Sequence, residues 1–456
     1  RRARTYAPVG RLKKASEDYP VGCSAFLSSL HDARYYQGIL SNTQNFSSET
    51  SCDILHVQNG KADWKNNANE DEMTRYLEVT ATRQDLSIIM AKLQAKDSDP
   101  DKTSVYRVIF CTIENANNTS FGCQLSLSST VALALLHKFQ ISPQYLSLLL
   151  GEPDYWAPGD FASFNAQGSL YRAEFFCQQP RWNIHKRDTP WCVYMTHIVP
   201  TETTTYVVVC SRMQARNEVV RERLTDMFRP RKGVSQLSNL LLPDPFMLHL
   251  VITHEALLDA KSVITEMRYT LYDALDNVDA YSKQPATHRA KDDLERLTLQ
   301  LHVVSQDIDS MAAGADMAGM ILRRIADAHQ RYATSVQKDE KKDALTKTID
   351  AINYLSTSME SQMRWLNSYK SRRDIAMNLV FNLVTQQDAA TSTTIAREAK
   401  ADGTSMKIIA ALTMVFLPGT YLSSVFGMAS LENAHWWLYV ALMLPLTLFV
   451  LIIWYI

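Results

Sequence analysis

Three hydroxyl side chains near the C-terminal end of the sequence fall on one side of a predicted helix. Thr413, Thr420 and Ser424 follow one another at steps of seven and four residues, which in an α-helix places them in one row. Hydroxyl groups in an apolar helix can bond a neighbouring helix or line a water-filled path. Apolar residues complete this row, which we term the hydroxyl face: Met406, Ile409, Thr413, Leu417, Thr420 and Ser424.

Two interpretations of the hydroxyl face remain open. Several copies arranged in a ring would alternate hydroxyl groups with apolar constrictions at Met406 and Leu417, as in a gated pore. Alternatively, the hydroxyl groups join the two apolar segments of one chain to each other. Two segments alone cannot enclose a conduit, so the pore interpretation requires an oligomer.

The hydroxyl face lies in the first of these two apolar segments. Residues 406–427 carry one charge, Lys407, and residues 436–456 carry none. A helix of about 20 residues spans roughly 30 Å, the thickness of the hydrocarbon core of a bilayer. Residues 428–435 form a short polar loop between the segments. The sequence therefore predicts a transmembrane hairpin of two helices with an external loop.

The charges beside the hairpin predict its orientation. Arg397, Lys400 and Lys407 precede or open the first span, whereas the loop contains neither Lys nor Arg. Since Lys and Arg accumulate on the cytoplasmic side, we expect an integral membrane protein with its N-terminal domain in the cytoplasm. The plasma membrane is favoured, and the mitochondrial inner membrane is the alternative.

The N-terminal half has a mixed pattern. Residues 1–50 are punctuated by Ser, Asn and Gly and are expected to form a loosely ordered lead-in, and residues 51–243 an α/β domain. Strands are predicted at 105–111, 191–199 and 204–210, and helices at 129–139 and 143–150. The motifs GxSxG and HExxH and a glycine-rich phosphate loop are absent from the sequence, so neither an enzyme nor a cofactor is predicted. The net charge of −1 does not favour nucleic acid, and the seven scattered cysteines are expected to be free thiols.

Residues 244–405 predict long helices that form a stalk. A heptad seam consists of Leu294, Leu297, Leu301, Val304, Ile308 and Met311. A second seam consists of Leu345, Ile349, Ile352, Leu355, Met359, Met363 and Leu366. The second helix is predicted to run from Lys342 to Gly403, directly before the first membrane span. Because a lone amphipathic helix cannot bury its apolar stripe, both seams should pack against partner helices.

The C-terminal residues resemble the CorA-type two-span transporters of divalent metal ions. The resemblance is carried by Met406, by Phe416-Leu417-Pro418 and by Phe426-Gly427-Met428, followed by a short loop and a second span. It implies an α+β membrane protein with a cytoplasmic α/β domain, long stalk helices and a C-terminal two-helix transmembrane hairpin, assembled as a funnel-shaped homopentamer. The implied function is a passive channel for Mg²⁺ or another divalent cation, gated by cytoplasmic metal.

One departure from the family concerns the loop. The family signature is Gly-Met-Asn, whose amide faces the outer pore mouth, but this sequence has Gly427-Met428-Ala429. The inner-pore asparagine of the family is replaced by Gly403, and Glu432 is the one acid in the loop. The predicted selectivity loop consists of Gly427, Met428, Ala429 and Glu432. Because it lacks the asparagine of the family, the alternative prediction is a non-conducting CorA-like membrane scaffold that has lost the selectivity filter.

The residues left to contact a cation are few. The predicted metal contacts are the Asp402 carboxylate, the Thr420 hydroxyl and the Gly427 carbonyl. Because Mg²⁺ holds its water tightly, contact through that water is expected. Asp402, and Asp388 before it, would concentrate cations if repeated around a ring. For Asp388 a solvated helix face is the simpler interpretation.

Overall fold

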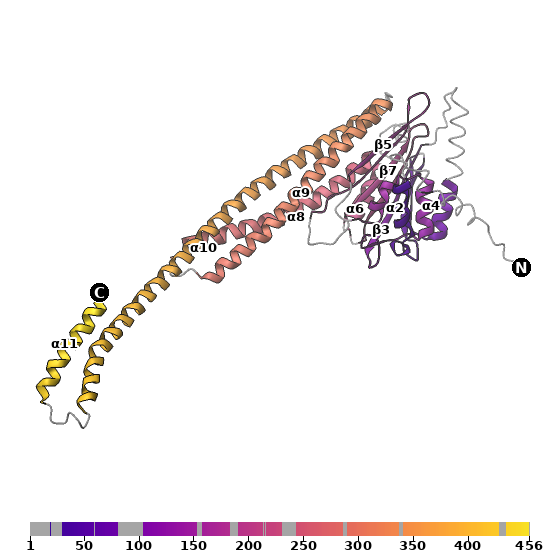
Figure 1. Ribbon diagram of the computed structural model, residues 1–456. Helices are drawn as coiled ribbons and strands as arrows, with labels where there is room; N and C mark the ends of the chain where they lie inside the picture. The colour runs from indigo at the N-terminus through magenta and orange to yellow at the C-terminus, as the bar shows by residue number, and fades with distance from the viewer. Residues whose placement is uncertain are drawn as a thin grey trace, which may run out of the picture. The chain divides into compact units, whose positions relative to one another are not determined.

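The computed structural model describes residues 19, 30–58, 60–80, 104–152, 157–182, 190–212, 214, 216–229, 243–285, 290–336, 341–427 and 435–455. The chain divides into two compact units (Figure 1). The first unit contains Arg1–Ala274 and Gln300–Asp374, and the second contains Leu275–Leu299 and Ile375–Ile456. The sheet belongs to the first unit, and the apolar hairpin belongs to the second.

A mixed eight-stranded sheet forms the centre of the first unit. Its strands run in the order β2-β1-β3-β8-β7-β6-β5, and β4 pairs with β3. The β3–β8 pair is parallel and the other pairs are antiparallel. The strands are β1 (Cys52–Gln58), β2 (Lys61–Ala68), β3 (Val105–Asn115), β4 (Cys123–Leu125), β5 (Gly159–Phe164), β6 (Leu170–Gln178), β7 (Cys192–Ile198) and β8 (Thr203–Ser211).

The predicted strands are confirmed as the central ones. β3, β8 and β7 are neighbours in the sheet, and most of their side chains are buried. Strands buried on both faces read as continuous apolar runs, which is why the sequence indicated them clearly. The predicted helices are also present, as α4 (Ser129–Lys138) and as η2 (Pro143–Tyr145) followed by α5 (Leu146–Leu149).

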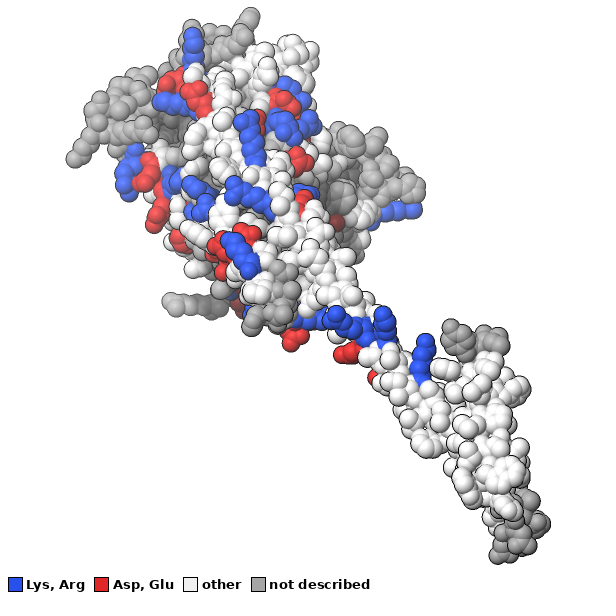
Figure 2. Space-filling view, turned by 90° about the vertical axis from the view of Figure 1, so that its left-hand side faces the viewer, with Lys and Arg blue, Asp and Glu red and all other residues white. Residues whose placement is uncertain are grey.

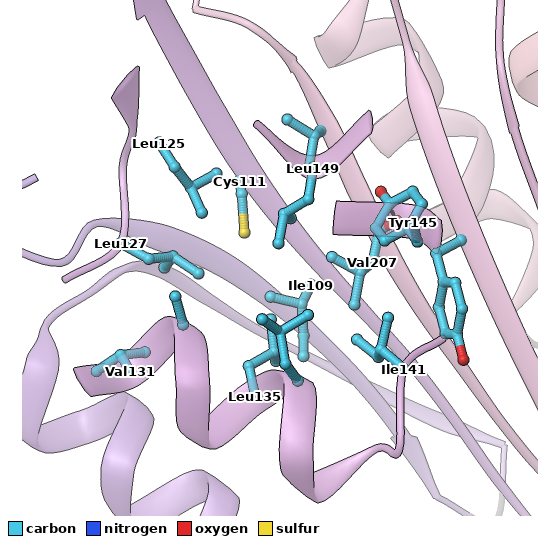
Figure 3. Packing of buried hydrophobic residues seen from close by; sticks show 14 of the residues in the cluster. Ile109, Cys111, Leu125, Leu127, Val131, Leu135, Ile141, Tyr145, Leu149 and Val207 are labelled. Carbon is cyan, nitrogen blue, oxygen red and sulfur yellow. Dashed lines mark hydrogen bonds between the residues drawn. The ribbon is translucent and has the colours of Figure 1, made fainter. Parts of the chain in front are cut away.

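One face of the sheet is covered by α4, η2 and α5 (Figure 3). Ile109 and Val207 of the sheet lie in one apolar cluster with Leu135 of α4. The Tyr145 hydroxyl lies 3.2 Å from the carbonyl oxygens of both Cys192 and Val207, which ties η2 to β7 and β8. Burying each large apolar side chain contributes about 2 kcal/mol to stability, so this cluster fixes the helices on the sheet.

The cysteines of the described residues are free thiols, as predicted. Cys52, Cys111, Cys123, Cys177, Cys192 and Cys210 are all buried, and none forms a disulfide with another described cysteine. Burial raises the pKa of the Cys192 thiol to about 12, so this group stays protonated at neutral pH. Cys23 lies outside the described residues.

The lead-in predicted for residues 1–50 is wrong in its second part. Helix α2 (Leu30–Ser41) and η1 (Thr43–Asn45) occupy this part. Ile39 joins the apolar cluster. The fully buried Asn45 donates a hydrogen bond of 2.8 Å from its amide to the Ile39 carbonyl oxygen. The segment is ordered because it covers the core.

A buried carboxylate joins α6 (Asn217–Met227) to α8 (Met247–Lys283) on the first unit. Glu255 of α8 is fully buried. Its two oxygens lie 3.0 Å from Nη1 of Arg216 and 2.9 Å from Nη2 of Arg223. Glu255 is therefore part of a structural clamp between α6 and α8.

Two fully buried histidines should make the stability of the first unit depend on pH. Desolvation lowers the pKa of both His197 and His249 from 6.5 to about 3. Between pH 6.5 and about pH 3, the two histidines bind protons in the unfolded chain but stay neutral in the folded chain. The free energy of unfolding should therefore be level above pH 6.5 and fall as the pH decreases toward 3, by up to about 1.4 kcal/mol per pH unit for each histidine. Urea unfolding followed by tryptophan fluorescence at several pH values measures this slope. A His197→Gln, His249→Gln variant with an unchanged slope would contradict the assignment.

The predicted heptad seam lies in α9 (Lys291–Val336) and is confirmed. All six of its residues are at most 4% exposed: Leu294, Leu297, Leu301, Val304, Ile308 and Met311. In the first unit, the Lys370 amine of α10 lies 2.9 Å from Asp309 of α9, and the Gln300 amide of α9 donates a hydrogen bond of 3.2 Å to Asp273 of α8. The two partner helices of the seam are therefore α8 and α10 (Figure 1).

The second seam, in α10 (Lys342–Phe426), is confirmed except at one position. Ile352, Leu355, Met359 and Leu366 are buried, and Leu345 and Met363 are half-buried. Ile349 is 44% exposed, so its assignment to the seam is wrong, and Thr348 is buried in its place. The Thr348 hydroxyl donates a hydrogen bond of 3.0 Å to the Ala344 carbonyl, which allows this polar side chain to be buried.

Gly403 does not separate the stalk from the first span. Helix α10 continues through Gly403 and through Pro418 to Phe426. A glycine inside a helix lowers the stability of the helix by about 1 kcal/mol relative to alanine. In a long helix, the cooperative hydrogen bonding of the neighbouring residues compensates this loss. The hydroxyl face and the acids before it therefore lie on one uninterrupted helix.

Candidate functional site

The C-terminal part of α10 and α11 (Trp436–Tyr455) form an apolar hairpin in the second unit. Both helices are long and apolar enough to cross a membrane, and only 17% and 0% of their most apolar windows are buried within the chain. Among the described residues, the end of the molecule that they form shows charged side chains in Figure 2 only at its boundary with the charged part. Apolar helices exposed in this way are covered by lipid, and the chain is an integral membrane protein.

The two helices pack through one side of α10, which we term the contact face: Gly419, Leu422, Ser423 and Phe426. The Tyr439 hydroxyl of α11 donates a hydrogen bond of 3.1 Å to the Gly419 carbonyl. It also lies 3.0 Å from the Ser423 hydroxyl, and its ring meets the Phe426 ring edge-on at 5.9 Å. This cluster was not predicted from the sequence, although small residues at a spacing of four, Gly419 and Ser423, are a signal for close helix packing.

The hydroxyl face lies on another side of α10. Helix geometry separates it from the contact face by about 120°. Met406, Ile409 and Leu417 are 71%, 64% and 65% exposed, and Thr413, Thr420 and Ser424 are exposed as well. The interpretation that these three hydroxyl groups join the two spans is therefore wrong, because Ser423 makes that contact.

The hydroxyl groups of this face bond their own helix. Thr413 donates to the Ile409 carbonyl, and Ser424 donates to the Thr420 carbonyl at 2.9 Å. Thr420 shares its proton between the carbonyls of Phe416 and Leu417, at 3.1 and 3.0 Å. The face therefore consists of exposed oxygen atoms in fixed positions.

The predicted metal contacts lie at separate levels of α10. Asp402 and Thr420 are 18 residues apart, which corresponds to about 27 Å along a helix, and Gly427 lies about 10 Å beyond Thr420. They cannot bind one ion together within one chain, and each could only contribute to a ring formed by several copies. In the described part of the chain, no group of three or more His, Cys, Asp or Glu residues is arranged to hold a metal ion.

The remaining predicted site residues are placed only in part. Asp388 and Asp402 are exposed and continue the direction of the hydroxyl face. Gly427 follows α10 directly and is exposed. Its N–H donates a hydrogen bond of 3.0 Å to the Ser423 carbonyl. Met428, Ala429 and Glu432 of the predicted selectivity loop lie outside the described residues.

Removing the Tyr439 hydroxyl should loosen the hairpin. We expect Tyr439→Phe to lower the stability of the α10–α11 contact by about 1 kcal/mol, a typical value for a hydrogen bond between membrane helices. Unfolding of the purified protein in mixed detergent measures this loss. Tyr421→Phe is the matched control, because Tyr421 is 65% exposed and lies off the contact face. Equal stability of the two variants would show that the Tyr439 hydroxyl does not hold the helices together.

Comparison with known proteins gives few close relatives. No family model matches the chain. A curated protein, notoamide biosynthesis cluster protein M' of Aspergillus versicolor, is 31% identical over 102 residues, which is 20% of this chain and 21% of the length of that protein. The match thus spans about a fifth of that relative.

Two solved structures are similar to most of the chain. The full-length CmaX protein covers 89% of it with a TM-score of 0.38 and 13% identity, and 96% of CmaX is matched. The CorA magnesium transporter from Methanocaldococcus jannaschii covers 88% with a TM-score of 0.35 and 11% identity, and 96% of that chain is matched. A CorA protein is thus among the matched structures, as the residues from Met406 to Met428 predicted. Because both TM-scores are low, we infer function from this chain's own residues.

Proposed function

We propose that this chain is a divalent-cation channel of the CorA type, in which copies of α10 surround a pore lined by the hydroxyl face. The observation that carries the proposal is that α11 packs on the contact face and leaves the hydroxyl face uncovered. Lipid cannot hydrogen-bond the exposed oxygens of Thr413, Thr420 and Ser424, whereas water in a pore can. Five copies related by rotation, a homopentamer, would turn this face toward a common axis.

The chemistry of the face suits a hydrated divalent cation such as Mg²⁺. Water bound to Mg²⁺ points its hydrogens outward, and the Thr420 hydroxyl and the Gly427 carbonyl can accept them. Rings of Asp402 and Asp388 would raise the local cation concentration at the cytoplasmic end. Flux would be passive and limited by the apolar ring at Leu417, with cytoplasmic metal favouring the closed ring.

Ion flux through the purified protein in liposomes tests this function. We expect uptake of Mg²⁺, Ni²⁺ or Co²⁺ down a concentration gradient, and no uptake by empty liposomes. Crosslinking in the same preparation reports the number of subunits. An assembled oligomer that conducts none of the three ions would contradict the channel.

A second candidate is a non-conducting membrane scaffold with the same architecture. It is favoured by two residues, Ala429 and Gly403, which stand where the resembling family carries asparagine. A scaffold would assemble normally but would transport no ions, even after Ala429→Asn restores the amide.

Thiol accessibility tests which face lines the pore. Single cysteine variants at positions 413, 417, 420 and 424 should react with a membrane-impermeant thiol reagent, because these positions would face water. Variants at Phe416 and Tyr421, which are 61% and 65% exposed in the single chain, should be protected by lipid or by neighbouring subunits. The opposite pattern would exclude the hydroxyl face as the pore lining.

A further inference from the structure

The part of α10 that precedes the first span sorts its charges onto opposite sides. Helix geometry places Arg397, Lys400 and Lys407 on one side and the acids Asp388, Glu398 and Asp402 about half a turn away. All six side chains are exposed. The acids lie on the side of the hydroxyl face, and the basic residues lie on the other side.

This arrangement does not stabilise the helix itself. Between Asp388 and Lys407, the charges at helix-neighbour spacing are like pairs, Arg397 with Lys400 and Glu398 with Asp402. Like charges three or four residues apart cost an isolated helix a few tenths of a kcal/mol. Ion pairing within this helix therefore does not explain why the charges are sorted.

The helix contacts of the hairpin place the basic side at the membrane surface. Gly419 and Tyr439 touch, and the two helices run in opposite directions from this point. Fifteen residues back along α10 is Thr404, and fifteen residues forward along α11 is Trp454, so both lie at about the same depth. Tryptophan near the end of a span marks the layer of lipid headgroups. Lys407 and Lys400 lie on either side of this level, and Arg397 follows one turn further from the bilayer.

We propose that Arg397, Lys400 and Lys407 form a binding face for the phosphate groups of anionic phospholipids. Guanidinium and ammonium groups form charge-assisted hydrogen bonds with phosphate oxygens. The long Lys407 side chain can extend from the apolar layer to the headgroups. The acids do not compete with these phosphates for the basic side chains or repel the phosphates strongly, because they lie about half a turn away around the helix. The inference concerns the outer side of α10 and holds whether or not the protein conducts ions.

Spin-labelled lipids test this face directly. The full-length protein is reconstituted in phosphatidylcholine that contains spin-labelled phosphatidylglycerol or spin-labelled phosphatidylcholine, and electron paramagnetic resonance measures the motionally restricted fraction of each. We expect a preference for phosphatidylglycerol that falls as salt is added. Each of the variants Arg397→Gln, Lys400→Gln and Lys407→Gln should reduce the preference by about fivefold at most, which corresponds to about 1 kcal/mol per charge.

Matched variants separate the proposed face from net charge. The charge-preserving Lys400→Arg should keep the preference, and Glu398→Gln on the opposite side should leave it unchanged, although both it and Lys400→Gln remove one charge. Single substitutions leave two basic residues in place, so insertion and orientation are retained. The proposal is overturned if all three basic variants keep the wild-type preference, or if Glu398→Gln changes the preference as much as Lys400→Gln.

Discussion

Leu417→Ser is expected to raise cation leak through the reconstituted protein by more than about tenfold. Leu417 would form the narrowest apolar ring of the pore, beside Pro418, and such rings stop ions by excluding water. Replacing leucine by serine lowers the hydrophobic transfer free energy of the side chain by about 2 kcal/mol. A barrier lowered by this amount corresponds to more than a tenfold increase in rate. Mg²⁺ influx into liposomes loaded with a fluorescent indicator measures the effect.

Leu412→Ser is the matched control for this experiment. Leu412 is 58% exposed in the chain, close to the 65% of Leu417, but lies about 140° away around the helix. Both variants make the same chemical change in the same span. If they leak equally, or if Leu417→Ser stays as tight as the wild type while assembled, Leu417 is not the constriction.

Ala429→Asn should sharpen the preference for Mg²⁺ and raise its uptake at low external concentration by about tenfold. An amide at this position can hold the water shell of the ion, whereas the alanine methyl group cannot, and such outer contacts change metal affinity by about ten- to a hundredfold. Uptake of Mg²⁺, Ni²⁺ and Co²⁺ in competition measures the preference. The wild type should conduct weakly or discriminate poorly among the three ions.

Ala434→Asn provides the control for the restored amide. It introduces the same side chain five residues later in the same loop, away from the Gly427-Met428 motif. The amide acts as proposed only if Ala429→Asn changes the preference and Ala434→Asn does not. A wild type that already selects Mg²⁺, with no change in either variant, would place the filter elsewhere.

The sequence predicted those parts of the fold whose residues are buried on a regular period. The α9 seam from Leu294 to Met311 and the central strands β3, β7 and β8 are such parts. The edge strand β2 gave no signal, because most of its side chains are exposed and it is held by pairing with β1. At Ile349 the apolar pattern was misleading, since a threonine one position earlier satisfies its own hydroxyl and takes the buried place.

The candidate site was predicted as a row of residues, but the side of α10 that α11 covers could not be. That choice depends on Tyr439, one polar group in an apolar span, which bonds the Gly419 carbonyl. Hydrophobicity is uniform around α11, so no amphipathic pattern marks its inner side. The position of the contact face, and with it the exposure of the hydroxyl face, became visible only from the hydrogen bonds.

The internal hydrogen bonds of the hydroxyl face determine which sign of charge it can accept. Thr413, Thr420 and Ser424 each have a single hydroxyl proton, and each proton is given to a carbonyl of α10. In the proposed pore, these side chains would therefore present only oxygen lone pairs toward the axis. Such lone pairs can solvate a cation or the outward hydrogens of its water shell, but they offer no donor to chloride or phosphate. The three side chains would thus reject anions without any charge of their own, and this rejection would persist at salt concentrations that screen the acids of the inner mouth.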